Sequence, residues 1–177
     1  AKKAGFNTKP IILGPLTFLL LAKGVDGINT IDLLDKVLPV YKEIIKKFSE
    51  LGAEWIQIDE PILVKDLDSN VVSKIKNTLN QLKDSAGSSK ILLTTYFEDL
   101  NEDIKKEVFA SSVDAVHLDL VRGTKNKEYV KNSNKKLSLG LVDGRNVWKA
   151  NLQEKIDFIK SHTSGDVIIA SSCPLLH

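Results

Sequence analysis

Eight consecutive residues, Glu54-Trp55-Ile56-Gln57-Ile58-Asp59-Glu60-Pro61, constrain the fold of this chain more than any other stretch. An apolar run typical of a buried strand leads directly into two adjacent carboxylates. Pro61 then stops the strand, because proline cannot donate to a sheet ladder. Asp59 and Glu60 are therefore expected at the carboxyl end of a strand. In α/β proteins, ligands bind at that end, in open sheets and in closed barrels alike.

The remaining sequence repeats the pattern of an apolar strand followed by a helix. Strands are predicted at 10–14, 55–58, 91–96, 115–120, 137–142 and 167–170. Helices are predicted at 16–23, 30–51, 71–82, 101–109 and from residue 151 to about residue 159. Thr30 is expected to cap the longest helix, and Asn151 with Glu154 resembles a capping box. Because helix-length connections join successive strands, these strands are expected to be parallel.

Six such units predict an α/β fold of the (β/α)8 TIM type. Neither a dinucleotide-binding fingerprint nor a phosphate-binding loop follows the first strand, which argues against a nucleotide-binding open sheet. A barrel of eight units takes about 250 residues, whereas this chain has 177. The prediction is a single incomplete barrel domain over residues 1–177, with about six of eight units. The absence of methionine and the start at Ala1 favour a fragment.

Composition excludes several classes of partner. The 25 basic and 23 acidic residues are mixed along the chain and leave a net charge of +2, so neither nucleic acid nor an anionic membrane is expected to bind. The longest apolar run, residues 16–22, is too short for the roughly 20 residues of a membrane span. A single cysteine excludes an internal disulfide and indicates a reducing compartment, hence a cytoplasmic location.

Five stretches of the chain resemble one known family, in that family's order. They are Ile12-Leu13-Gly14-Pro15, residues 54–61, Leu93-Thr94-Thr95-Tyr96-Phe97, Leu139-Gly140-Leu141-Val142-Asp143-Gly144-Arg145-Asn146, and Ala170-Ser171-Ser172-Cys173 with Leu175-Leu176-His177. Together they are similar to the amino-terminal barrel of cobalamin-independent methionine synthase.

The resemblance implies both a function and a division of labour. Enzymes of this family carry two face-to-face barrels and move a methyl group from 5-methyltetrahydrofolate polyglutamate to homocysteine. Catalysis and zinc belong to the carboxyl-terminal barrel, which would be the partner of this domain in the same polypeptide. This chain would then hold strands three to eight of the amino-terminal barrel. It would have no catalytic residue, bind no cofactor of its own and be inactive alone.

The resemblance also predicts that a zinc site has been lost from this barrel. When the two barrels are matched by their Asp-Glu-Pro stretches, the His-x-Cys ligands fall on Leu93 and Thr95, the glutamate on Asp119 and the second cysteine on Cys173. Leucine cannot bind zinc, and a threonine hydroxyl is a poor ligand beside imidazole or thiolate. Asp119 and Cys173 are then relics of a metal site.

Substrate contacts are expected from polar side chains that follow the strands. The candidates are Asp59, Glu60, Thr95, Asp119, Asp143, Arg145, Asn146 and Ser172. By resemblance, Asp59 is a remnant of an amino-acid site, and Arg145 could hold a carboxylate bidentately. A structural role for the two acids, capping the next segment or pairing with Arg122 or Arg145, is favoured over a binding role.

Two alternatives to the methyltransferase remain. A self-contained metal-dependent hydrolase or lyase would use His117, Asp119 and Asp59, since residues two apart on a strand point to the same side. Cys173 and His177 could add ligands at another strand end. Against this stand simpler roles, an interior histidine for His117 and a small buried hydrophobe for Cys173. The second alternative is a binding module of the same fold without chemistry.

Overall fold

The computed structural model describes residues 2–24, 27–131, 133–163 and 165–175. His177 and Leu176 lie outside the described residues. The strands are β1 (Ile11–Leu13), β2 (Trp55–Asp59), β3 (Lys90–Thr94), β4 (Ala115–Asp119), β5 (Lys136–Val142) and β6 (Ile168–Ser171). The α-helices are α1 (Pro15–Leu21), α2 (Leu34–Glu50), α3 (Ser69–Asp84), α4 (Glu102–Phe109) and α5 (Leu152–His162). Four short 3-10 turns are η1 (Lys2–Ala4), η2 (Thr30–Leu33), η3 (Pro61–Val64) and η4 (Lys125–Tyr129).

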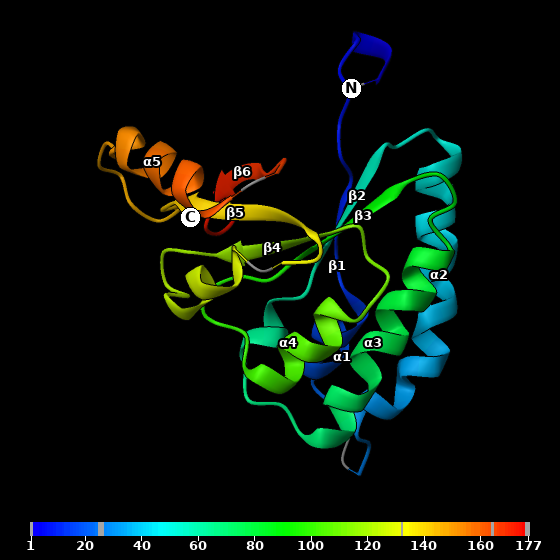
Figure 1. Ribbon diagram of the computed structural model, residues 1–177. Coiled ribbons are helices and arrows are strands. Elements are labelled where there is room, and N and C mark those ends of the chain that lie inside the picture. The colour runs from blue at the N-terminus through cyan, green and yellow to red at the C-terminus, as the bar shows by residue number, and fades with distance from the viewer. Residues whose placement is uncertain (1, 25–26, 132, 164, 176–177) are drawn as a thin grey trace.

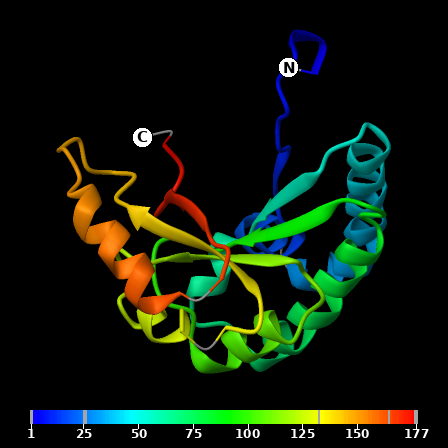
Figure 2. The same ribbon diagram turned by 45° about the horizontal axis from the view of Figure 1, so that its top comes forward.

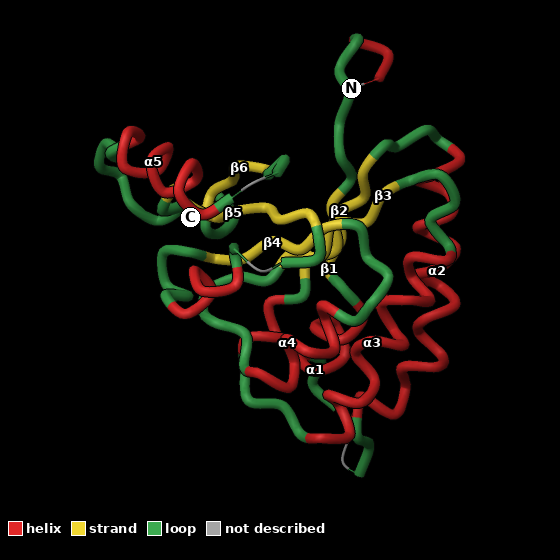
Figure 3. The backbone as a smooth tube through the Cα atoms, viewed as in Figure 1, coloured by secondary structure: helices red, strands yellow, loops and turns green. Residues whose placement is uncertain are grey.

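All six strands form one parallel sheet in the order β1-β2-β3-β4-β5-β6. The carboxyl ends of the strands therefore share one edge of the sheet, as the sequence predicts. The sheet curves strongly, and the α-helices lie on its convex side (Figures 1 and 2). The tube in Figure 3 shows each strand connected to the next through helices or loops on that side.

The convex face of the sheet is apolar and carries the core. Side chains that point toward the helices include Ile56, Ile58, Ile91, Leu93, Val116, Leu118, Leu137 and Leu139, all buried. They belong to one cluster with the inner faces of α2, α3 and α4. Apolar side chains at every second position follow from the two-residue repeat of a strand, and burial of such surface supplies about 25 cal/mol per Å².

Along each strand, the side chains on the concave face alternate with these core residues, and many of them are polar. Gln57 and Asp59 of β2, Thr94 of β3, His117 of β4 and Ser138 of β5 occupy the intervening positions, and register pairs Asp59 with Thr94 and Thr94 with His117. Barrel interiors are ordinarily filled with branched apolar residues. The inner face of this sheet is thus unlike a packed barrel core.

The two edge strands are open among the described residues. Ile11 of β1 is 57% exposed and Ile169 of β6 is 61% exposed. Helix α5, next to β6, has no fully buried residue. Both ends of the curved sheet therefore lack the neighbours that a closed barrel would provide.

Observed boundaries agree with the predicted ones within about three residues, with one clear correction. The predicted helix 30–51 begins as the 3-10 turn η2, and α2 starts at Leu34 without a side-chain cap. Thr30 is therefore not the cap of the long helix. The predicted cap of the last helix is present, since Asn151 Oδ1 accepts from Glu154 N, and the structure adds a cap at Asn101, whose Oδ1 accepts from Ile104 N.

Candidate functional site

The concave face of the sheet holds a cavity of about 570 Å³. Its polar lining comes from successive strands and the segments next to them: Lys9, Gln57, Asp59, Thr94, Tyr96, His117, Ser138, Ser171 and Cys173. Apolar side chains of β1 and β6 line its open sides. The inward direction of these polar groups follows from the strand repeat that turns their neighbours toward the core.

Asp59 is the anionic centre of this cavity and is held by two neutral donors. Gln57 Nε2 donates to Asp59 Oδ1 over 2.7 Å, and the Tyr96 hydroxyl donates to the same oxygen over 3.2 Å. Gln57 Nε2 also lies 2.9 Å from the Tyr96 hydroxyl. Burial raises the pKa of the Asp59 carboxyl, and the hydrogen bonds from Gln57 and Tyr96 and the charge of Lys9 oppose that rise.

His117 lies deeper and is 2% exposed. Its Nδ1 is 3.0 Å from the Ser138 hydroxyl. Its Nε2 has no partner of ordinary hydrogen-bond geometry in the described part of the chain. Burial lowers the pKa of the imidazole to about 4, although the backbone of Ser172 and the charge of Asp119 favour the protonated form. The ring is therefore neutral near pH 7.

Glu60 points away from the cavity and is completely buried on the other side of the chain. Its carboxylate accepts from Leu16 N, from Thr17 N and from the Thr17 hydroxyl, at 3.0, 2.7 and 2.5 Å. Burial raises its pKa to about 7 against these hydrogen bonds. Glu60 thus ties the start of α1 to the end of β2. The expected capping of the next segment is wrong for this residue, because the Glu60 side chain forms no cap hydrogen bond with η3.

The predicted pairing of these acids with arginine is wrong for the described residues. Neither arginine forms an ion pair with Asp59 or Glu60 there. Arg145 instead places its guanidinium carbon 4.8 Å from the centre of the Phe97 ring. The backbone hydrogen bonds to Glu60 come from residues more than 40 positions away, so sequence spacing could not show them.

Three further predicted site residues form hydrogen bonds with backbone groups: Thr95, Asp119 and Ser172. The Thr95 hydroxyl donates to the His117 carbonyl, and Gly144 N donates to the Ser172 hydroxyl. Asp119 Oδ1 accepts from the amides of residues 121 and 122, while Oδ2 accepts from Phe97 N. Phe97 has a positive φ of 83°, a strained conformation for a residue with a side chain. Asp119 therefore fixes the two loops that leave β3 and β4.

The predicted residues after β5 lie on an exposed turn. Asp143 Oδ1 accepts from Arg145 N over 3.0 Å, and Asn146 Oδ1 accepts from Trp148 N over 2.9 Å. Asp143 and Asn146 also line a groove of about 350 Å³ that is separate from the central cavity. The structure therefore brings Asp59, His117 and Cys173 to the central cavity. The other candidates are not part of its lining.

The structure corrects the positions that were matched to the lost zinc ligands. Leu93 belongs to the core on the convex side, and the Thr95 hydroxyl donates to the His117 carbonyl. Thr94 and Tyr96 line the cavity in their place. A shift of one residue in a strand moves a side chain to the opposite face, so the pair on β3 that faces the cavity is Thr94 and Tyr96, not Leu93 and Thr95.

These residues do not fit a zinc ion. Thr94 and Tyr96 supply neither imidazole nor thiolate, and the carboxylate of Asp119 is engaged by three amides. Over the described residues, no three His, Cys, Asp or Glu side chains come together to bind a metal. The set His117, Asp119 and Asp59 therefore gains no support as a metal-dependent hydrolase centre.

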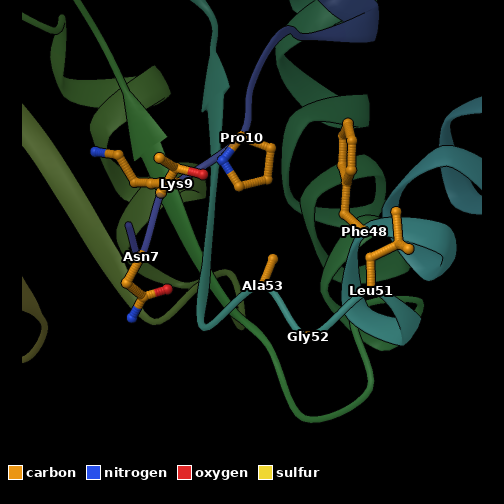
Figure 4. Close-up of a pocket in the computed structure, with 8 residues that line it drawn as sticks. Asn7, Lys9, Pro10, Phe48, Leu51, Gly52 and Ala53 are labelled. Carbon is orange, nitrogen blue, oxygen red and sulfur yellow. The ribbon is translucent and has the colours of Figure 1, made fainter. Parts of the chain in front are cut away.

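A second cavity of about 210 Å³ lies at the opposite end of the strands (Figure 4). Its lining comes from the segment before β1 and from the turn between α2 and β2: Asn7, Thr8, Lys9, Pro10, Phe48, Leu51, Gly52 and Ala53. The amino ends of barrel strands contribute to stability rather than to catalysis. This cavity is therefore not the candidate site.

Comparison with known proteins decides the family. The model for "Cobalamin-independent synthase, N-terminal domain" matches residues 1–165. The chain belongs to this family. Among curated members, the 5-methyltetrahydropteroyltriglutamate–homocysteine methyltransferase of Xylella fastidiosa (strain M23) is 41% identical over 180 residues. That of Mesorhizobium japonicum is 42% identical over 185 residues. The alignments cover 98% and 100% of this chain but 24% of each relative, so the chain spans about a quarter of their length.

Solved structures agree on the fold of this cobalamin-independent synthase domain. A B12-independent methionine synthase from Shewanella sp. W3-18-1, in complex with selenomethionine, matches with a TM-score of 0.77 at 16% identity. The match covers 98% of this chain and 57% of that chain. A methyltransferase from Methanosarcina mazei matches with a TM-score of 0.71 at 18% identity, over 98% of this chain and 55% of that chain. The predicted fold class, a partial TIM-type α/β barrel, is confirmed.

The signal for the cavity residues was present in the sequence but incomplete. Gln57 stands two residues before Asp59, and Thr94 stands two before Tyr96, so both pairs share a face. Lys9 and Ser138 carried no comparable signal, because their contribution depends on the curvature of the sheet. As for membranes, no helix in the described part of the chain is long and apolar enough to cross one.

Proposed function

We propose that this chain forms strands three to eight of the amino-terminal barrel of a methyltransferase. That enzyme moves a methyl group from 5-methyltetrahydrofolate polyglutamate to homocysteine and so makes methionine. The observation that carries the proposal is identity of about 40% along the whole chain to relatives with this activity in their names. Those relatives are about four times as long, which leaves room for the rest of the barrel and for a second one.

The proposal assigns the chemistry to the carboxyl-terminal barrel of the same polypeptide. Zinc bound there would lower the pKa of the homocysteine thiol, which is about 8.5 when unperturbed. In the present barrel, β3 presents Thr94 and Tyr96 to the cavity, and both are weaker zinc ligands than imidazole or thiolate. Its residues act as a scaffold that holds the catalytic barrel and the folate substrate in position.

Two groups of residues are candidates for contact with substrate in the complete enzyme. Asp59, oriented by Gln57 and Tyr96, presents a carboxylate to the central cavity. Asp143, Arg145 and Asn146 lie at the same end of the sheet on an exposed turn, where a guanidinium could bind a folate carboxylate. The remaining candidates support the site by hydrogen bonds with backbone groups: Glu60, Thr95, Asp119 and Ser172. The proposal includes a cytoplasmic location, on the ground of the single cysteine.

The test compares this chain with the full-length polypeptide that contains it. Methionine formation is measured with homocysteine, methyltetrahydrofolate triglutamate and added zinc. We expect activity from the full-length protein and none from residues 1–177. Cys173→Ser should leave activity of the full-length protein within about twofold, since Cys173 is a buried small side chain. Methionine formation by the 177-residue chain, lost on Cys173→Ser, would move the catalytic centre into this barrel.

A further inference from the structure

The ring of Phe97 holds an arginine at the carboxyl edge of the sheet. The guanidinium carbon of Arg145 lies over this ring, 4.8 Å from its centre. Phe97 follows β3 and Arg145 follows β5, whereas β4 lies between these two strands in the sheet (Figure 1). Neighbouring strands are about 4.8 Å apart, so the contact spans roughly two strand spacings. The two side chains therefore meet over the carboxyl end of β4.

The backbone of Phe97 is strained where the ring makes this contact. Its φ of 83° is the only positive φ at a non-glycine residue in the described part of the chain. Asp119 Oδ2 accepts from Phe97 N over 3.2 Å, while the other oxygen of that carboxylate accepts from the amides of residues 121 and 122. Strained backbone persists only where its surroundings hold it, and it clusters at ligand sites. Glycine would adopt this φ without strain, which indicates a role for the ring itself.

The Arg145 guanidinium is available to a ligand. Over the described residues, no acidic side chain forms an ion pair with it. Its backbone is fixed, since Asp143 Oδ1 accepts from Arg145 N over 3.0 Å, and Gly144 N donates to the Ser172 hydroxyl. A ring contact covers one face of a guanidinium, whereas the N–H donors lie in its plane. Those donors remain free to bind both oxygens of a carboxylate.

The same ring also touches the lining of the central cavity. The ring centres of Phe97 and Tyr96 are 5.7 Å apart, and the Tyr96 hydroxyl donates to Asp59 Oδ1. A continuous series of contacts therefore leads from Asp59 through the two rings to Arg145. A ligand held by Arg145 is thereby placed beside the cavity.

We propose that Phe97 is a positioning residue, whose ring holds the Arg145 guanidinium in the orientation that binds a carboxylate of the substrate. An unrestrained arginine side chain samples many rotamers, and ordering it on binding weakens the affinity. The ring restricts the guanidinium before the ligand arrives. Asp119 in turn fixes the direction of the ring through the amide of Phe97.

The inference rests on the proposed function for the source of the carboxylate, which is either the glutamate tail of the folate or homocysteine. It goes beyond that function by assigning Phe97 and Asp119 to the orientation of the group that binds the carboxylate.

The test is calorimetric titration of the full-length polypeptide, with γ-linked triglutamate and homocysteine as separate probes. We expect Phe97→Leu to raise the dissociation constant of one probe about two- to fivefold, the effect of a lost cation–π contact at an exposed site. Phe97→Tyr keeps the ring and should leave it unchanged. Arg145→Gln should raise it about five- to tenfold, because charge-assisted hydrogen bonds are lost. Arg122→Gln is the matched control, since Arg122 follows β4 at the same edge and has no ring contact among the described residues.

A double variant separates positioning from a general loss of structure. If Phe97 acts through Arg145, Phe97→Leu should cause no further loss of affinity when Arg145 is already replaced by glutamine. Arg145 lies on an exposed turn, so Arg145→Gln should leave the fold intact.

Each outcome decides the inference. The probe that loses affinity identifies the source of the carboxylate, and a loss for either probe supports the inference. A wild-type polypeptide that binds neither probe would overturn it. So would unchanged affinities in Phe97→Leu or in Arg145→Gln, or equal losses from Phe97→Leu with and without Arg145. Methyl transfer is assayed in the same samples: activity with unchanged affinities would reject the inference alone. The expected losses in a polypeptide without methyl transfer would support the inference and reject the proposed function.

Discussion

Gly140 of β5 lies directly against the imidazole ring of His117 on β4. A Cβ atom at position 140 would come within 3.0 Å of both Cε1 and Nε2 of that ring, and within 2.8 Å of the Ser172 Cα. His117 is only 2% exposed, so its ring cannot swing aside without displacing its neighbours. The glycine is what allows a ring to occupy the inner face of the sheet between β4 and β6.

Gly140→Ala should therefore destabilise the protein. Overpacking of a filled interior costs about 1–3 kcal/mol, and the expected loss in the free energy of unfolding lies in that range, measured by urea denaturation. Gly165→Ala is the control, because a Cβ there would meet nothing within 4 Å, and its effect should stay within about 0.5 kcal/mol. Equal effects at both positions would contradict the steric argument.

Removal of the Glu60 carboxylate should cost more. Glu60→Ala leaves the amides of Leu16 and Thr17 and the Thr17 hydroxyl without an acceptor in a buried place. With about 1–3 kcal/mol for each unsatisfied group and partial relief by water, a loss of about 3 kcal/mol or more is expected from denaturation curves. Glu54→Ala, at an exposed position of the same segment, should be nearly neutral. A neutral Glu60→Ala would refute the role of Glu60 in tying α1 to β2.

His117 should make stability depend on pH in the acid range. Its pKa falls from 6.5 to about 4 on folding because burial disfavours the charged ring. The unfolded chain therefore binds the proton first, and stability is lost as pH falls from about 6.5 toward 4, by about 3 kcal/mol in total. Glu60, whose pKa is raised to about 7, loses stability as pH rises over the same range. The contribution of His117 is therefore measured as the difference in urea midpoint between the wild type and His117→Gln, which should grow between about pH 6.5 and 4, whereas His162→Gln should show no such trend.

The isolated 177-residue chain should self-associate. Ile11 and Ile169 expose large side chains on the two open edge strands, and exposed edges pair with other chains. Light scattering at micromolar concentration should detect association, and Ile169→Lys should reduce it. A cooperative, soluble monomer with an ordinary unfolding transition would show that the edges are not a liability, and would count against the proposal that two strands are missing.

The sequence predicted the elements well because their signals are local. Apolar runs located the six strands, helical spacing located the helices, and Asn151 was recognisable as a cap from its own neighbours. The register of β3 relative to the cavity was mistaken by one residue, since Leu93, Thr94 and Thr95 form a run without a clear alternation. Which side each faces depends on the pairing of Thr94 with His117, a contact 23 residues apart.

The candidate site was harder to predict than the fold, because most of its polar groups are engaged by distant backbone. Asp119 stands after a strand like a catalytic acid, yet its oxygens serve the amides of two loops. Glu60 also follows a strand like a catalytic acid, and its oxygens likewise accept hydrogen bonds from distant backbone amides. Hydrogen bonds of this kind depend on where α1 and the loops come to lie, which no spacing in the chain records.

The order of the strands in the sheet has a consequence for how the chain is made. Because β1 to β6 pair in the same order in which they are synthesised, each strand that leaves the ribosome finds its neighbour already present. Each strand after β1 can pair with the preceding strand before any later segment has been synthesised. Pairing over long loops, which slows the folding of many β proteins, is thereby avoided among these six strands. The domain can grow during translation one unit at a time.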